Sequence, residues 1–213
     1  LAGGTESMSM VPMMGNKVAL SPEVFAKNEN VAIAYGMGIT AEKVAEEWKI
    51  SREDQDRWAL RSQQRAGRAM ASGYFAEEIV PVSAPGGKAG PITVDKDEHP
   101  RPETTADELA KLKTPFRNPG TVTAGNASGV NDGAAALIVS SEAAARKHGL
   151  TPIARLLGGA AAGVAPRIMG ISPAPATEKV LALTGLKLEQ LDVIELNEAF
   201  AAQGLAVLRL LGL

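Results

Sequence analysis

Cysteine is absent from this 213-residue chain. Its absence excludes disulfide bonds, thiolate-bound metal ions and a cysteine nucleophile within these residues. A chain without cysteine is typical of proteins kept under reducing conditions. The sequence therefore favours a cytoplasmic location.

Histidine, aromatic residues and excess charge are also scarce. The chain has two histidines, 4% aromatic residues and a formal net charge of −2. No basic face suggests a nucleic-acid partner, no apolar run reaches the length of a membrane span, and no secretory signal is recognised at the start. His99 falls in a predicted loop and His148 at a predicted helix end, so we expect both to be structural or solvated, and we expect no metal site.

The remaining pattern predicts an α/β protein. Strand-like segments alternate with helical ones, which favours a mainly parallel, layered sheet in one large or two small domains. We expect strands at residues 78–82, 92–95, 122–124, 134–140, 153–157 and 192–196. We expect helices at residues 40–48, 52–72, 106–112, 142–148, 177–183 and 201–211.

Several helix ends carry local signals. Thr40 is a candidate N-cap for the first helix, and Ser51 with Asp54 matches a capping box for the second. Gly73 and Gly185 follow the last apolar positions of two helices, where glycine commonly ends the helix. These signals place helix boundaries without reference to the rest of the chain.

Asn197 occupies the most informative position. It follows the predicted strand at 192–196 and precedes the predicted helix at 201–211, so it is expected at the N-cap. In open α/β sheets this is where ligands bind and where free N–H groups favour negative charge. Asn197 is therefore either a helix cap or a site residue.

Two glycine-containing segments also suggest ligand contact. Residues 36–41 imitate a dinucleotide-binding fingerprint, but no second strand ending in an acidic residue follows at the required spacing, which argues against a nicotinamide site. Residues 125–129 are small and polar, so a ligand could approach the backbone closely there. An ordinary turn is the alternative for this second segment.

Four segments resemble the thiolase family, in the order in which that family carries them. They are residues 3–10, 121–137, 164–176 and 192–200, the last reading DVIELNEAF. Residues 95–113 and 205–212 look most like the branch that acts on β-ketoadipyl-CoA. The resemblance implies an α/β fold: part of a thiolase-type layered core with a helical-and-loop insertion.

The resemblance also implies an activity and a set of site residues. Thiolases transfer an acyl group from a β-ketoacyl-CoA to coenzyme A, or run the reverse Claisen condensation, with coenzyme A as substrate and no covalently bound cofactor. By resemblance, Asn197 holds a water molecule that stabilises the enolate oxygen. Ala124 and Ser128 contact the pantetheine arm, and Arg101 lies near the adenine and ribose-phosphate end. Met37, Met169 and Phe200 line the acyl or pantetheine tunnel, with core packing as the alternative reading.

The resemblance places the family's nucleophilic cysteine before the equivalent of Leu1, and its Gly-His-Pro histidine and second cysteine after the equivalent of Leu213. The chain therefore looks like the central part of a subunit that forms a homodimer or homotetramer when complete, and we expect it to be inactive alone. The expected parts are residues 1–14 and 119–150 of the N-terminal core half, an insertion at 15–118, and residues 151–213 of the C-terminal half. The alternatives are a non-catalytic module that binds acyl-CoA or lipid, and a dimerisation scaffold without a ligand.

Overall fold

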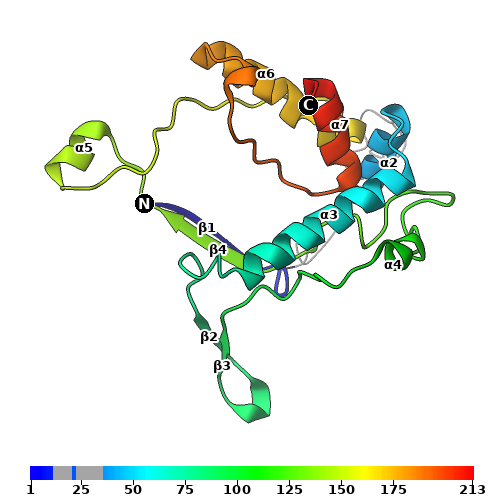
Figure 1. The fold of residues 1–213 in the computed structure, drawn as a ribbon, viewed down its shortest axis with the longest axis horizontal. Coiled ribbons are helices and arrows are strands. Elements are labelled where there is room, and N and C mark those ends of the chain that lie inside the picture. The colour runs from blue at the N-terminus through cyan, green and yellow to red at the C-terminus, as the bar shows by residue number, and fades with distance from the viewer. Residues whose placement is uncertain (12–20, 23–35) are drawn as a thin grey trace.

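A group of helices packs together in the computed structural model, in the upper and right part of Figure 1; the structure describes residues 1–11, 21–22 and 36–213. The helices that pack together there are α2 (Met37–Glu47), α3 (Arg52–Ala71), α6 (Pro173–Thr184), α7 (Ala201–Leu211) and the 3₁₀ helix η2 (Pro166–Ile171). The remaining helical elements are η1 (Gly87–Ala89), α4 (Ala106–Ala110), α5 (Glu142–Lys147) and η3 (Leu188–Gln190). The strands are β1 (Ala2–Glu6), β2 (Val82–Ala84), β3 (Ile92–Val94) and β4 (Gly133–Leu137).

Small apolar residues let α2 and α7 approach closely. Val44 of α2 and Ala206 of α7 are fully buried and pack with Ile171 of η2. Ala45 and Ala202 form a second buried group with Ile50, and Trp48 packs against both groups. Burial of this apolar surface stabilises this group of helices, with a free energy of about 25 cal/mol for each Å² removed from water.

The local signals at helix ends are confirmed at Ser51, Gly73 and Gly185 but not at α2, and the expected capping box is only half formed, because no hydrogen bond joins Ser51 N to the Asp54 carboxylate in the described structure. Ser51 Oγ accepts a hydrogen bond of 3.0 Å from Asp54 N at the start of α3. Gly73 and Gly185 adopt positive φ angles of 72° and 71° just beyond α3 and α6, conformations that cost glycine little. The expected Thr40 cap is wrong, because α2 begins after Gly36 and the Thr40 hydroxyl donates to Met37 O inside the helix.

The predicted parallel sheet is not found among the described strands. β1 pairs antiparallel with β4, from Ala2 opposite Leu137 to Glu6 opposite Gly133, and β2 pairs antiparallel with β3. The second pair is the hairpin expected around residues 86–87, with its first strand at Val82–Ala84 rather than 78–82.

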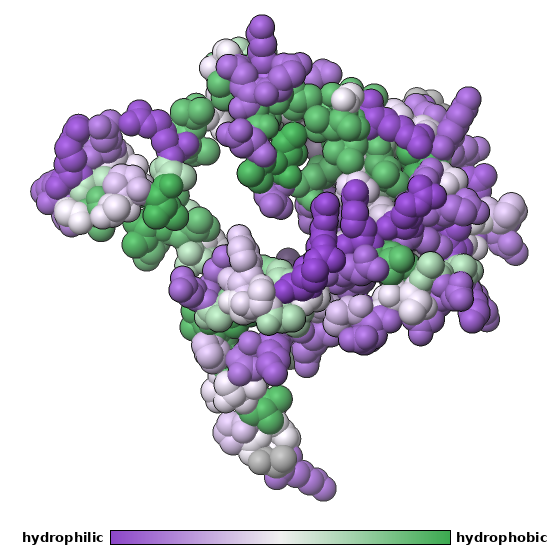
Figure 2. Space-filling view, in the orientation of Figure 1, coloured by the Kyte–Doolittle hydropathy of each residue, from purple (hydrophilic) through white to green (hydrophobic). Residues whose placement is uncertain are grey.

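Three predicted strands are absent from the described structure. Residues 122–124, 153–157 and 192–196 adopt no regular strand, and Ile153 and Val193 are 100% and 76% exposed. An apolar run forms a strand only when a neighbouring strand supplies hydrogen-bond partners for its backbone. None of the described segments supplies such partners to these three runs. Figure 2 shows the resulting apolar surface beside the α6–α7 end, with hydrophilic side chains over α3. No helix in the described ranges is long and apolar enough to cross a membrane.

A carboxylate ties the end of β1 to the approach to β4. Asp132 accepts hydrogen bonds from Ser9 Oγ at 2.5 Å and from Ser9 N at 2.8 Å. The Ser9 hydroxyl and backbone N–H groups stabilise the charged form and lower the pKa of Asp132 below its ordinary value.

We expect this tie to contribute to stability only while Asp132 is ionised. A carboxyl with a lowered pKa in the folded state adds stability above its unfolded pKa, and that stability is lost as the pH falls through the folded pKa. Denaturation of the wild type and of Asp132→Asn should therefore differ at pH 6 and converge towards pH 3. A difference that grew on acidification would contradict the assignment.

Candidate functional site

A buried carboxylate of α2 anchors the loop at residues 121–128. Glu42 is 3% exposed and accepts hydrogen bonds from Thr121 N, Thr121 Oγ1 and Val122 N, at 2.8 to 3.0 Å. These hydrogen bonds compensate the Glu42 carboxylate for its burial. The contact joins α2 to a loop about eighty positions further along the chain.

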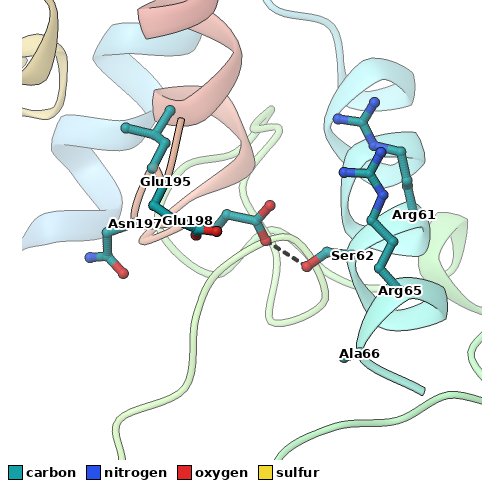
Figure 3. A pocket seen from close by; sticks show the side chains of 8 residues that line it. Arg61, Ser62, Arg65, Ala66, Glu195, Asn197 and Glu198 are labelled. Carbon is teal, nitrogen blue, oxygen red and sulfur yellow. Dashed lines mark hydrogen bonds between the residues drawn. The ribbon is translucent and has the colours of Figure 1, made fainter. Parts of the chain in front are cut away.

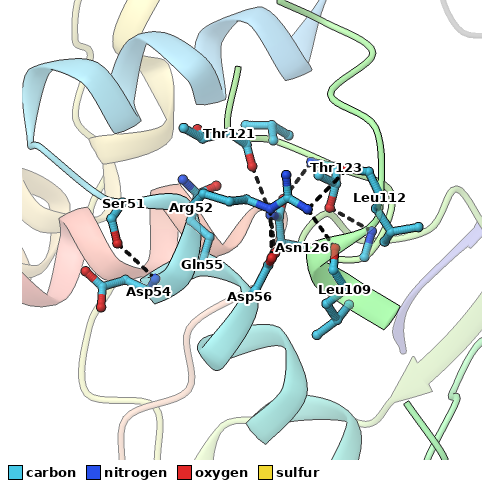
Figure 4. A network of polar contacts seen from close by, with 12 residues as sticks. Ser51, Arg52, Asp54, Gln55, Asp56, Leu109, Leu112, Thr121, Thr123 and Asn126 are labelled. Carbon is cyan, nitrogen blue, oxygen red and sulfur yellow. Dashed lines mark hydrogen bonds and ion pairs between the residues drawn. The ribbon is translucent and has the colours of Figure 1, made fainter. Parts of the chain in front are cut away.

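Asn126 closes the same loop on itself and ties it to α3 (Figure 4). Its Nδ2 group donates to Asp56 Oδ1 at 2.9 Å and to Thr121 O at 3.1 Å, and its Oδ1 accepts from Thr123 N at 2.8 Å. Asp56 in turn pairs with Arg52 at 2.7 Å. The polar groups of Asn126 are therefore committed to structure rather than left free for a ligand.

The loop then pairs with the segment that enters α7. Ser128 N donates to Ala199 O at 2.9 Å, and Ala201 N donates to Asn126 O at 2.9 Å. An isolated antiparallel bridge joins Ala127 to Phe200 between these two bonds. Two segments that the sequence singled out separately, 125–129 and 197–201, thus form one unit.

The same pairing corrects the expected role of Asn197 as a helix cap. The N-cap of α7 is Phe200, and no side chain caps that helix. α7 begins at Ala201, four residues after Asn197, so Asn197 lies outside the capping position, and Asn126 O satisfies the first of the helix's free N–H groups, that of Ala201. Asn197 instead is exposed, and its side chain has no hydrogen-bond partner among the described residues.

Two clefts meet at Asn197. One of about 500 Å³ lies between α3 and the segment before α7 (Figure 3). The second, of about 280 Å³, runs along an adjoining face of α3 towards the 125–128 loop. Asn197, Glu198, Ser62 and Ala66 border both clefts. Arg61 and Arg65 of α3 add positive charge to the first cleft, opposite Glu195 and Glu198.

The second cleft brings together residues expected at the coenzyme A site. Ser128 and Asn197 both line it. Arg101 lies at its edge, because Arg101 N donates to Gln63 Oε1 at 2.7 Å and Gln63 lines the cleft. Gly67 permits this approach of the loop to α3, since a Cβ there would lie 2.5 Å from Pro102 Cβ.

The other expected site residues do not line either cleft. Phe200 sits on the bridge beside the cleft, and Ala124 is exposed on the loop that leads into it. Met37 at the start of α2 and Met169 in η2 are 38% and 42% exposed and line neither cleft. Contact of these four side chains with a ligand stays a prediction.

Sequence reasoning did not single out Ser62, Glu198 or His99 as residues that line these clefts. His99 is exposed, as expected, but it also lines the second cleft, with its ring against Gly129. Its position two residues before Arg101 was the available signal. The described residues include no group of three or more histidine or acidic side chains able to hold a metal ion.

Comparison with known proteins gives one consistent match. Residues 1–143 match the family model "Thiolase, N-terminal domain", and residues 150–213 match "Thiolase, C-terminal domain". The chain is 56% identical to the β-ketoadipyl-CoA thiolase of Pseudomonas aeruginosa and 54% identical to the 3-oxoadipyl-CoA/3-oxo-5,6-dehydrosuberyl-CoA thiolase of Escherichia coli. All of this chain aligns in both cases, over 56% and 57% of those proteins, so it spans about half the length of these relatives.

Solved structures agree with the sequence matches. Human mitochondrial 3-ketoacyl-CoA thiolase superposes with a TM-score of 0.86 at 45% identity, over 99% of this chain and 56% of that one. The dimeric peroxisomal thiolase of Saccharomyces cerevisiae gives a TM-score of 0.89 at 40% identity, over 99% of this chain and 53% of that one.

Proposed function

This chain belongs to the thiolase family, and from that premise we propose that the protein carrying it transfers acyl groups from β-ketoacyl-CoA to coenzyme A, or catalyses the reverse condensation. The observation that carries the proposal is the shared cleft. Ser128 and the unpartnered amide of Asn197 line one wall of it, fixed by the pairing of residues 126–128 with 199–201.

The substrate class follows from the names of the relatives. Those from Pseudomonas aeruginosa and Escherichia coli are named for β-ketoadipyl-CoA and 3-oxoadipyl-CoA, whose acyl groups end in a carboxylate. We infer a β-ketoacyl-CoA of this kind as the substrate here. Breakdown of aromatic compounds and of fatty acids both produce β-ketoacyl-CoA thioesters.

The roles of the residues follow from the chemistry. Thiolysis passes through an acyl-enzyme, which divides a difficult carbon–carbon cleavage into two easier steps. Within these 213 residues there is no cysteine to carry that acyl group, so their part is binding and charge stabilisation. Asn197 orients a water molecule towards the enolate oxygen, where a fixed donor stabilises the developing charge.

The coenzyme A contacts extend along the cleft from that point. Ala124 and Ser128 contact the pantetheine arm, and Arg101 pairs with phosphate or stacks on adenine, which suits a guanidinium. Met37, Met169 and Phe200 complete the apolar tunnel. We propose coenzyme A thioesters as the small-molecule ligands and no covalently bound cofactor.

We expect these 213 residues alone to show no thiolase turnover, because they contain no cysteine. Thiolysis of acetoacetyl-CoA and of β-ketoadipyl-CoA by the purified chain should stay at background. Turnover that survives a mass check of purity would contradict this expectation.

A non-catalytic acyl-CoA or lipid binding module is the second candidate, and the lack of cysteine is the observation that favours it. The complete protein distinguishes the two. Thiolysis of β-ketoadipyl-CoA that depends on coenzyme A supports the enzyme, whereas tight binding of the thioester without turnover supports the module.

We expect Arg101→Ala in the complete protein to weaken coenzyme A binding while nearly preserving turnover. Loss of one charge-assisted contact costs about 1 to 3 kcal/mol, so KM for coenzyme A should rise by roughly ten-fold to a hundred-fold. Arg146→Ala is the control, because Arg146 lies in α5, away from α3 (Figure 1). A fall in kcat with an unchanged KM would contradict the placement of Arg101.

We also infer a homodimer or homotetramer in the cytoplasm for the complete protein. The yeast relative is described as dimeric. Light scattering after size-exclusion chromatography tests the assembly, and a monomer at micromolar concentration would overturn it.

A further inference from the structure

We propose that Ser62 and Glu198 act as a positioning pair that holds Asn197 in its productive orientation. The inference rests on the proposed function, since it assigns this pair to the orientation of the oxyanion water. Ser62 Oγ donates to Glu198 Oε2 at 2.5 Å, across 136 positions of sequence. Figure 3 shows Glu198 reaching from the segment before α7 to Ser62 on α3.

The bond is the tie nearest to Asn197 along the chain. Downstream, the segment is held at Ala199 O by Ser128 N and at Ala201 N by Asn126 O. Upstream, residues 192–197 make no hydrogen bond within the described structure. Among the described residues, the Ser62–Glu198 bond is therefore the one side-chain hydrogen bond made by residues 192–201, and it holds the residue that follows Asn197.

The direction of the Glu198 side chain explains how its bond to Ser62 acts on the neighbouring Asn197. Adjacent side chains of a non-helical, extended chain point to opposite sides. In Figure 3 the carboxylate of Glu198 points towards α3, and the amide of Asn197 points away from it. Anchoring Glu198 on α3 therefore keeps the amide of Asn197 turned away from α3, whereas a free Glu198 would let the backbone between the two residues rotate.

The proposed role of Asn197 requires precise positioning, which the Ser62–Glu198 hydrogen bond can provide. A donor to a developing oxyanion must already stand in place when the charge forms, and a misplacement of about 1 Å can cost on the order of a hundred-fold in rate. The Ser62–Glu198 hydrogen bond supplies such order from α3, whose Asp56, itself paired with Arg52, also accepts a hydrogen bond from Asn126.

The test is a set of variants in the complete protein, with kcat, KM and melting temperature measured for each. We expect Ser62→Ala and Glu198→Ala to lower kcat by roughly ten-fold or more, with KM for the thioester and the melting temperature nearly unchanged. Ser62→Thr keeps the hydroxyl donor, and Glu198→Gln keeps an oxygen acceptor, so both should retain most of the turnover. Ser72→Ala, at the end of α3, and Glu189→Ala, in η3, are the controls.

A double variant separates positioning from other roles. If the two residues act through one bond, the double variant Ser62→Ala/Glu198→Ala should have the same kcat as the less active of the two single variants. The inference is overturned if Ser62→Ala keeps wild-type kcat, if KM changes instead, or if Glu198→Gln is as damaging as Glu198→Ala, which would indicate a role for the charge itself. Failure of the wild type to catalyse thiolysis would overturn the proposed function instead.

Discussion

Replacing Asn197 with alanine in the complete protein is expected to lower turnover about a hundred-fold or more and to leave the folded state almost unchanged. One lost oxyanion donor typically costs this much in rate. The stability should hold because Asn197 is exposed, caps no helix and bonds no other described residue. Steady-state kinetics and a thermal melt of the same preparations measure the two effects separately.

Asn197→Asp separates the water-orienting role from simple polarity. Aspartate has nearly the same shape but places negative charge beside the developing enolate, so turnover should fall at least as far as in the alanine variant. Exposed Asp192, in the same segment, provides a matched control as Asp192→Asn. If aspartate at position 197 left turnover intact, Asn197 would have no part in oxyanion stabilisation.

Glu42→Ala is expected to cause the largest loss of stability. The substitution removes the acceptor of four hydrogen-bond contacts and leaves Thr121 N and Val122 N without partners in the interior. Hydrogen bonds to a charged group are worth about 1.5 to 3 kcal/mol each, and the contacts are not additive, so we expect a loss of roughly 3 to 5 kcal/mol. Chemical denaturation at neutral pH measures it.

Two further variants sharpen this expectation. Glu42→Gln keeps one oxygen acceptor and should lose less, whereas Glu47→Ala, at an exposed position of the same helix, should change stability little. Hydrogen exchange of Val122 and Thr123 should accelerate in Glu42→Ala, because the loop loses its anchor. Equal stability of Glu42→Ala and Glu47→Ala would show that the buried carboxylate does not hold the loop.

The helices were predictable because their signals are local. Ser51 and Gly73 mark the ends of α3 within a few residues, and the apolar spacing at residues 201–211 matches α7 as observed. The family-specific segments likewise identify a thiolase-type α/β fold, which the family models and the solved thiolases confirm. The strands expected at 153–157 and 192–196 failed because a strand depends on a partner, which an apolar run does not specify.

The site was predictable only in part for the same reason. Residue types and motif resemblance pointed to Asn197, Ser128 and Arg101, and the fold brings the first two to one cleft with the third at its edge. The sequence also implied that Asn197 caps α7, which is wrong because α7 begins after Phe200, three residues further along the chain.

The sequence by itself determined the family, the helix ends and the segments from which the site is built, because each depends on residues close together in the chain. Only the tertiary structure decided which groups hold those segments. Glu42 meets Thr121, and Ser62 meets Glu198, across separations of 79 and 136 positions. A hydrogen bond requires its two groups to lie within about 3 Å, and no local preference of the chain sets that distance between residues so far apart.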